Sequence, residues 1–403
     1  MPLVAKAVRP PLDHLLALSD DTGIIQHAIL DVPNRSTGYC TDDVSRAFMM
    51  VLQRLRGEPT NATLKRLAGT YLAFLCDAQM EDGWFHNFMS YGREWLDERG
   101  TQDSFGRALW SLGYGMRFAR RKPWRGVCTR MLDAALPRIG ELEYIRSKAY
   151  AILGLWHALK SPSLSLPLDK LGVTQNKLSV TQSDDAPSAR SFDKLRVTQS
   201  DKLRVTRGVT QPHNAYLDSM RPLGSDLRAA YERHRTDDWH WFEDVMTYDN
   251  PRLCEASIYA GEAFGDERLV EIGLESLRFY INTGMENGIF VPIGNEGWYE
   301  RGGQRARFGQ QPLEAVAMID GGLAAYERSN DPLFLSAARA AWLWYYGQNT
   351  AGTTIVEDGG CHDGIDQNAV NPNMGAESTL AYLSAAATMS EAENAFTANV
   401  NAQ

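Results

Sequence analysis

The segment Thr41–Gln79, TDDVSRAFMMVLQRLRGEPTNATLKRLAGTYLAFLCDAQ, sets a pattern that the rest of the chain repeats. Its apolar residues recur three or four positions apart, which is the spacing of one face of a helix. Thr41 is a suitable N-cap, Asp42 and Asp43 suit a first turn, and Gly57 suits a helix end. The segment therefore predicts two consecutive helices, at 41–57 and 61–79, that form a hairpin.

The same pattern returns along the whole chain. Further helix pairs are predicted at 103–119 with 124–136, 145–159 with 214–234, 251–264 with 267–282, and 312–328 with 332–347. A last helix at 375–388 is expected to take its partner from 12–18. Twelve helices in six hairpins predict an all-α fold, an (α/α)6 toroid that forms one domain over residues 1–403.

The ring has a consequence for function. Each inner helix of such a toroid begins at the same end of the ring, so residues near these starts meet although they are far apart in sequence. We therefore expect a convergence of Asp42, Asp103, Asp249, Gln311 and Glu377.

Residues 161–212 interrupt the pattern with a different kind of sequence. The unit DKLGVTQ at Asp169 recurs as NKLSVTQ, DKLRVTQ and DKLRVTR. Short repeats rich in Ser, Thr, Asp and Lys are typical of solvated segments without a packed core. We expect a low-complexity repeat insertion that forms a flexible loop, with a docking segment for a partner as the alternative.

Composition narrows the class of protein. Acidic residues outnumber basic ones by 50 to 41, which gives a net charge of -9 and argues against a nucleic-acid partner. No apolar run is long enough for a membrane span and no signal peptide is recognisable, so we expect a cytoplasmic protein. The five cysteines are scattered, without the spacing of a zinc site, and we expect neither metal nor cofactor.

Four carboxylates are candidates for acid/base chemistry: Asp43, Asp103, Glu243 and Glu377. Glu243 lies in a Trp-rich stretch, where burial would raise its pKa as a general acid requires. The other three lie at predicted helix starts, where capping or the helix dipole explains an acidic residue equally well.

Long loops rich in aromatic and amide side chains precede the predicted inner helices. Rings stack on sugar faces and amides hydrogen-bond to hydroxyl groups, so such loops are typical of carbohydrate sites; core packing is the alternative. The candidate substrate-binding residues are Asp42, Trp84, His86, Asn87, Trp239, His240, Tyr248, Asn250, Trp298, Tyr299, Gln310 and Gln311.

Several of these stretches together resemble a known family. GYCTDDVSRA, DGWFHNF, QDSFGRALW, TYDNPRL, IGNEGWYERGG and GAESTLAYL look like a bacterial carbohydrate-active family of the six-hairpin glycosidase superfamily, found alone or with glycosyltransferase modules. The resemblance covers the chain outside the insertion, although Met374 stands where the family pattern has Gln. It implies the (α/α)6 toroid, a sugar substrate and, for a hydrolase, inversion.

Three functions follow from these observations. The first is a glycoside hydrolase that cleaves an oligosaccharide, with Glu243 or Asp103 as acid and Glu377 or Asp43 as base. The second is a sugar epimerase or isomerase that pairs two of the histidines predicted in the rim loops, His27, His86, His240 and His362. The third is a non-catalytic glycan-binding partner of a glycosyltransferase.

Overall fold

The computed structural model describes residues 9–162 and 212–402. Twelve α-helices follow one another: α1 (Asp13–Leu18), α2 (Thr41–Gly57), α3 (Ala62–Ala78), α4 (Gln102–Phe118), α5 (Lys122–Ala135), α6 (Ile145–Leu159), α7 (Pro212–His234), α8 (Pro251–Phe264), α9 (Glu267–Gly284), α10 (Pro312–Ser329), α11 (Pro332–Trp344) and α12 (Ala376–Ala402). The predicted helices are confirmed to within a few residues, except that α12 continues well beyond residue 388. The insertion predicted at 161–212 lies almost wholly outside the described residues.

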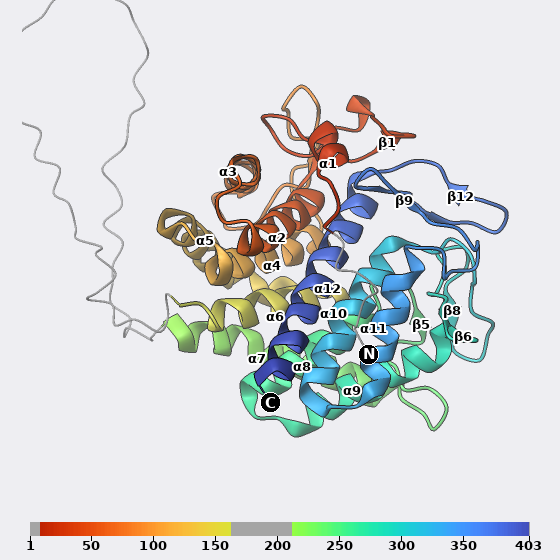
Figure 1. Ribbon diagram of the computed structural model, residues 1–403. Helices are drawn as coiled ribbons and strands as arrows, with labels where there is room; N and C mark the ends of the chain where they lie inside the picture. The colour runs from red at the N-terminus through yellow and green to blue at the C-terminus, as the bar shows by residue number, and fades with distance from the viewer. Residues whose placement is uncertain (1–8, 163–211, 403) are drawn as a thin grey trace, which may run out of the picture.

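The even-numbered helices form a closed ring. α2 packs on α4, α4 on α6, α6 on α8, α8 on α10, α10 on α12, and α12 returns to α2. Each is followed by an outer helix that packs against it, from the α2–α3 pair to the α10–α11 pair, and α1 contacts α12. In Figure 1 the colour runs once around this ring from red to blue, with α12 beside α2. The all-α (α/α)6 toroid is therefore confirmed.

The helix starts differ in detail from the prediction. Cys40, rather than Thr41, is the N-cap of α2, and its Sγ accepts a hydrogen bond from the backbone N–H of Asp43. Thr41 is instead the first helical residue, and its hydroxyl donates to the backbone carbonyl of His86. Thr101 caps α4, which places Asp103 in the first turn rather than at the cap.

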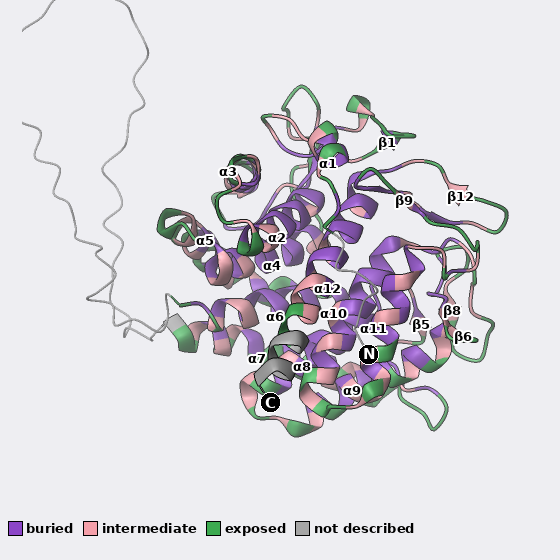
Figure 2. Cartoon of the chain, in the orientation of Figure 1, coloured by how far each residue is buried: buried purple, intermediate pink, exposed green. Residues whose placement is uncertain are grey.

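The α4–α6 contact is the closest approach between two inner helices, and glycine makes it possible. A Cβ atom on Gly113 would lie 1.9 Å from the carbonyl oxygen of Gly154, and one on Gly154 would lie 2.4 Å from that of Leu109. Neither position has space for a side chain, so the two backbones meet directly. Around this contact, the inner helices are buried along most of their length (Figure 2).

The two ends of the ring differ. Short turns such as Gly265–Asp266 and Asn330–Asp331 follow the inner helices α2, α4, α8 and α10, whereas residues 160–211 separate α6 from α7. Long loops precede most of the inner helices. These loops carry strand pairs of two residues each, for example β3 (Tyr39–Cys40) with β4 (Phe88–Met89) and β5 (Val245–Met246) with β8 (Tyr299–Glu300). We call the end with long loops, where the inner helices begin, the loop end, and the other the turn end. Among the described residues, no helix has the length and apolar composition that a membrane span requires.

Candidate functional site

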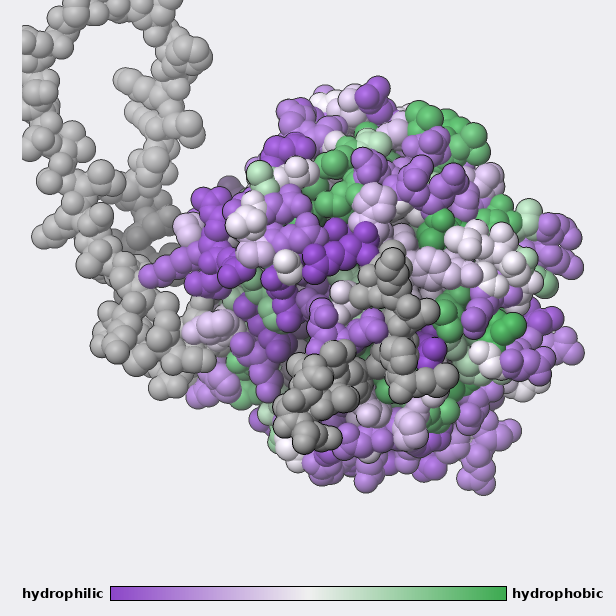
Figure 3. All heavy atoms as spheres, viewed as in Figure 1, coloured by the Kyte–Doolittle hydropathy of each residue, from purple (hydrophilic) through white to green (hydrophobic). Residues whose placement is uncertain are grey.

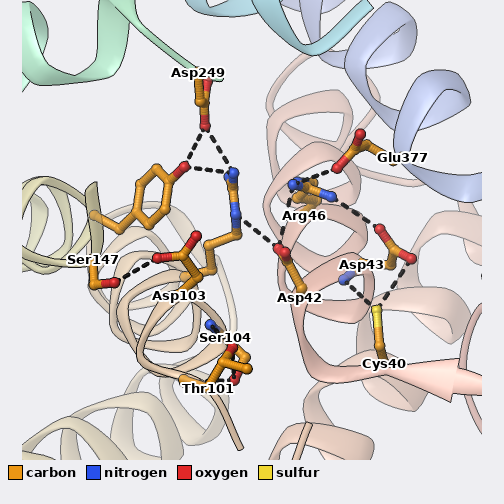
Figure 4. Close-up of polar contacts among 12 residues, drawn as sticks. Cys40, Asp42, Asp43, Arg46, Thr101, Asp103, Ser104, Ser147, Asp249 and Glu377 are labelled. Atoms are coloured by element: carbon orange, nitrogen blue, oxygen red, sulfur yellow. Dashed lines mark hydrogen bonds and ion pairs between the residues drawn. The ribbon is translucent and has the colours of Figure 1, made fainter. Parts of the chain in front are cut away.

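Arg107 connects carboxylates from two other inner helices at the loop end. Its Nε lies 2.8 Å from Oδ1 of Asp42 on α2, and its Nη2 lies 2.7 Å from Oδ2 of Asp249, which precedes α8 by two residues. The hydroxyl of Tyr150 on α6 donates to the same Asp249 oxygen at 2.7 Å. In Figure 4, the labelled Asp42 and Asp249 lie at the two ends of this bridge.

Arg46 forms a second bridge, one turn into α2. Its Nη1 lies 3.0 Å from Oδ1 of Asp43, and its Nη2 contacts Glu377 of α12 at 2.8 Å and Asp42 at 3.5 Å. Asp43 also accepts a hydrogen bond from the thiol of Cys40 at 3.2 Å. Arg46 thus closes the ring between its first and last inner helices (Figure 4).

Asp103 completes the group from the first turn of α4. Its Oδ1 accepts from the hydroxyl of Ser147 on α6 at 2.5 Å, and its Oδ2 accepts from the hydroxyl of Tyr248. Its charge acts on Asp42 and on Arg107. We call these residues the carboxylate–arginine cluster: Asp42, Asp43, Arg46, Asp103, Arg107, Asp249 and Glu377. The predicted convergence therefore holds for Asp42, Asp103, Asp249 and Glu377.

The carboxylates of this cluster differ in how far they are exposed to solvent. The side chains of Asp42 and Glu377 are 25% and 37% exposed, whereas those of Asp43 and Asp249 are buried. Burial raises the pKa of Asp43 to about 7, against the attraction of Arg46. Asp249 is the opposite case: burial alone would raise its pKa, but Arg107 and Arg252 outweigh burial and lower it.

The pKa of Asp42 is raised. Burial is the main cause, and the negative charges of Glu377 and Asp103 add to it, while Arg107 and Arg46 oppose the shift. Asp42 is thus a partly exposed carboxyl group whose surroundings favour retention of a proton.

Glu243 lies outside the cluster. Its Oε2 pairs with Nη1 of Arg146 at 2.6 Å, and Arg146 also donates to the backbone carbonyl of Tyr248. The carboxylate is committed to this salt bridge, which holds the Trp-rich loop on α6. The structure therefore offers no support for Glu243 as the proton donor.

Asn250 and Glu314 form a buried neighbouring pair. The amide of Asn250 donates to the carbonyl of Thr247 and to Oε2 of Glu314, and the hydroxyl of Tyr280 donates to the same Glu314 oxygen at 2.6 Å. Burial raises the pKa of Glu314 to about 7. Asn250 is wholly buried, so its observed role is to fix the loop before α8 rather than to meet a ligand.

Two of the three tryptophans expected to stack on sugars do not fit that role. Trp84 is 3% exposed, and its ring contacts are with Phe105, at 4.0 Å between centroids, and with the guanidinium of Arg99. Trp239 is also buried and donates its indole N–H to the carbonyl of Glu243. Both tryptophans are therefore part of the hydrophobic core.

Trp298 and Tyr299 remain partly exposed at the loop end. Trp298 adopts a left-handed backbone conformation, with φ of 59°, and its ring lies 6.4 Å from that of Tyr248. Tyr299 packs edge-on against Trp239. Of the predicted stacking groups, Trp298 is therefore the one next to a residue that contacts Asp103.

The other predicted binding residues have local partners. His86 stacks on Trp95 and contacts the carbonyl of Asp97, while His240 lies near the hydroxyl of Tyr231. Both ends of the wholly buried Gln310 amide are bonded, the nitrogen to Thr350 and the oxygen to the indole of Trp344. Asn87 is buried, and its side-chain oxygen has no hydrogen-bond partner within the described structure; Gln311 is the N-cap of α10.

Sequence reasoning missed the residues that organise the cluster. Arg46 could have been found, because it lies three and four positions after Asp43 and Asp42, the spacing of side chains that meet on a helix. Ser147 and Tyr150 give no such signal, since their contacts with Asp103 and Asp249 span 44 and 99 positions of the chain.

Neither metal nor paired histidines are indicated at this site. Within residues 9–162 and 212–402, no group of three or more His, Cys, Asp or Glu side chains is arranged to hold a metal ion. In the same ranges, none of His27, His86, His240 and His362 shares a hydrogen bond with another histidine or with the carboxylate–arginine cluster.

Comparison with solved structures supports the architecture. A cellobiose 2-epimerase from Bacillus thermoamylovorans superposes with a TM-score of 0.64 over 96% of each chain, at 11% identity. A D-mannose isomerase gives 0.62 over 94% of each chain at 8% identity, and a GH76 α-mannanase from Bacteroides thetaiotaomicron gives 0.56 over 96% of this chain and 95% of its own, also at 8%. No protein-family model and no curated protein sequence matches the chain.

The fold is therefore shared with a cellobiose 2-epimerase, a D-mannose isomerase and an α-mannanase. Proteins named for epimerisation, isomerisation and hydrolysis have this fold, so the fold alone does not select a function.

Proposed function

We propose that this chain is a glycoside hydrolase that cleaves an oligosaccharide with carboxyl groups of the carboxylate–arginine cluster. The observation that supports this most strongly is the meeting of partly exposed acidic side chains from α2, α4 and α12 at the end of the ring where the long loops lie. The resemblance of the loop motifs to a carbohydrate-active family and the fold of the similar structures agree with a sugar substrate.

Asp42 is the proposed general acid. A general acid must hold its proton near neutral pH, and the raised pKa of Asp42 meets that requirement at a partly exposed position. Asp43 is buried against Cys40 and Arg46, which suits a positioning residue rather than a group that touches substrate.

Asp103 is the proposed base that activates water. Two hydroxyl donors, Ser147 and Tyr248, fix the position of its carboxylate. Glu377 suits this role less well, because it and Asp42 contact the same Nη2 atom of Arg46 at 2.8 and 3.5 Å. The two oxygens that contact this Nη2, Oδ1 of Asp42 and Oε2 of Glu377, are no further apart than the sum of those contacts, which is below the roughly 6.5–9.5 Å of an inverting pair.

The second candidate is a sugar epimerase that uses two histidines. Its only support is the fold that this chain shares with the cellobiose 2-epimerase. A non-catalytic glycan-binding module associated with a glycosyltransferase is a third. A cytoplasmic location is part of the proposal and follows from the sequence alone.

The test is incubation of the purified chain with manno-, gluco- and galacto-oligosaccharides, with products separated by chromatography. We expect release of shorter sugars, with a loss of about 10²–10⁴-fold in rate in Asp42→Asn and in Asp103→Asn. The matched control is Glu296→Gln, an exposed loop carboxylate outside the cluster. Interconversion without cleavage would favour the epimerase, and binding without turnover would favour the glycan-binding module.

A further inference from the structure

A cavity inside the ring extends from the carboxylate–arginine cluster toward the turn end. It has a volume of about 680 Å³ and is lined by the inner helices, from Arg107 to Phe118 on α4 and from Leu313 to Glu327 on α10. Its inner end reaches Arg46 and Arg107, whose other contacts hold Asp42. The cavity therefore adjoins the carboxylate–arginine cluster through these two arginines, which belong to both.

Polar groups line the cavity. Trp110 is 8% exposed, and its indole N–H, which is itself enclosed, has no hydrogen-bond partner within the described residues. Asp320, with a side chain 22% exposed, pairs with Nη2 of Arg252 at 2.8 Å, and Arg252 also pairs with the buried Glu255. An unpartnered buried donor is costly unless a ligand or water satisfies it, so a small shift of Trp110 toward a ligand in the cavity would remove that cost.

Aromatic rings form the opposite part of the wall. Trp156 of α6 and Tyr259 of α8 stack with centroids 3.9 Å apart, and both line the cavity together with Phe118. The Trp156 indole N–H also lacks a partner in the described structure. Flat rings beside carboxylates and N–H donors suit a molecule with apolar faces and hydroxyl edges.

The charges that line the cavity are balanced. Five arginines and four acidic residues lie there: Arg46, Arg56, Arg107, Arg117, Arg252, Glu255, Asp320, Glu327 and Glu391. Four of the arginines are in salt bridges, and Arg117 contacts Nδ1 of His157 and lies over the rings of Phe118 and Trp156. A neutral ligand suits this lining, because a phosphate or carboxylate would have to displace an existing partner to reach a cation.

We propose that this cavity is a second saccharide site, which binds a neutral mono- or disaccharide at the turn end of the toroid. Its volume falls within the roughly 300–1,000 Å³ of small-molecule pockets. The inference does not depend on hydrolysis at the loop end. Because Arg46 and Arg107 line the cavity and also hold Asp42, a sugar bound there would contact the residues that fix the proposed acid.

The test uses the full chain carrying Asp103→Asn, which prevents turnover, titrated calorimetrically with cellobiose, mannobiose and lactose. Ser384 lines the cavity from α12 and is only partly buried, so Ser384→Phe fills the space with little disturbance of the core. We expect it to weaken binding of at least one disaccharide by more than about tenfold. Ser336→Phe, the same change at an exposed position of α11, should leave affinity within about twofold.

A second variant tests the indole N–H of Trp110. Trp110→Phe keeps an aromatic ring but removes the unpartnered N–H, and should weaken binding by about three- to tenfold. Unchanged affinity in Ser384→Phe, absence of binding by all three sugars, or tighter binding of glucose 6-phosphate than of the neutral sugars would overturn the inference. Hydrolysis by the wild-type chain is measured separately, so either proposal can fail while the other stands.

Discussion

Tyr248 contacts the proposed base more directly than any other side chain from the aromatic loops. Its hydroxyl donates to Asp103, and its ring lies beside the guanidinium of Arg146. Burial is the main cause that raises the pKa of Tyr248, and the neighbouring Asp103 charge adds to it, so the hydroxyl stays protonated as a donor.

Tyr248→Phe should therefore slow the reaction without unfolding the chain. A hydrogen bond to a charged group contributes about 1.5–3 kcal/mol, which corresponds to about a ten- to hundredfold lower kcat/KM. Steady-state kinetics on the best oligosaccharide checks this, with Tyr144→Phe at an exposed position as the control. Equal rates in the two variants would remove Tyr248 from the mechanism.

The raised pKa of Glu314 predicts that the stability of the folded chain depends on pH. Its pKa is raised from 4.5 to about 7 by burial, so the folded chain holds this proton more tightly than the unfolded chain does. The resulting stabilisation is complete below about pH 4.5 and is lost as the pH rises to about 7, with a magnitude of about 3 kcal/mol.

Glu314→Gln should remove that part of the fall in stability between about pH 4.5 and 7. Urea unfolding midpoints measured across this range provide the comparison, and Glu300→Gln, at an exposed position, is the control. If both variants lose stability with rising pH as steeply as the wild type, Glu314 does not titrate as described.

At the scale of the elements, the α4–α6 contact should tolerate the least change. Gly154→Ala would place a methyl group 2.4 Å from the carbonyl of Leu109, and the helices must separate to admit it. We expect a loss of about 1–3 kcal/mol in the free energy of unfolding. Gly126 of α5 has nothing within 4 Å of its Cβ position, so Gly126→Ala should stabilise by up to about 1 kcal/mol. A thermal unfolding series in which both variants shift in the same direction would contradict this account of the contact.

The helices were predictable because each has a local sequence pattern that does not depend on distant residues. Apolar spacing within residues 41–79 depends only on neighbouring positions, and Pro251, Pro312 and Pro332 mark first turns on their own. The caps were less predictable: Thr101 and Asp103 both suit a helix start, and only the loop geometry selects Thr101.

The site was partly predictable at the scale of the whole molecule. Once the helices form a ring, its symmetry brings Asp42, Asp103 and Glu377 to one end without any knowledge of their contacts. The ring does not say which aromatic residues face solvent, and for that reason Trp84 and Trp239 were assigned to sugar binding although they pack in the core.

The exposed apolar residues of the loops could not be predicted from helix periodicity. Figure 3 shows hydrophilic and hydrophobic residues mixed over the face in view, with hydrophobic residues gathered around β1 (Ala28–Ile29), where Ile29, Leu30 and Val32 are exposed. Such exposure depends on how the loops fold back, which no local periodicity records.

Hydrolysis of a glycosidic bond by the carboxylate–arginine cluster adds an oxygen atom from water to the product. The wild-type chain and Asp42→Asn are incubated with an oligosaccharide in water enriched in heavy oxygen, and the masses of the products are measured by mass spectrometry. We expect the wild type to release shorter sugars whose new reducing end carries heavy oxygen, and the variant to release almost none. Sugars of unchanged length without the label, or equal cleavage by both proteins, would contradict the proposed hydrolysis.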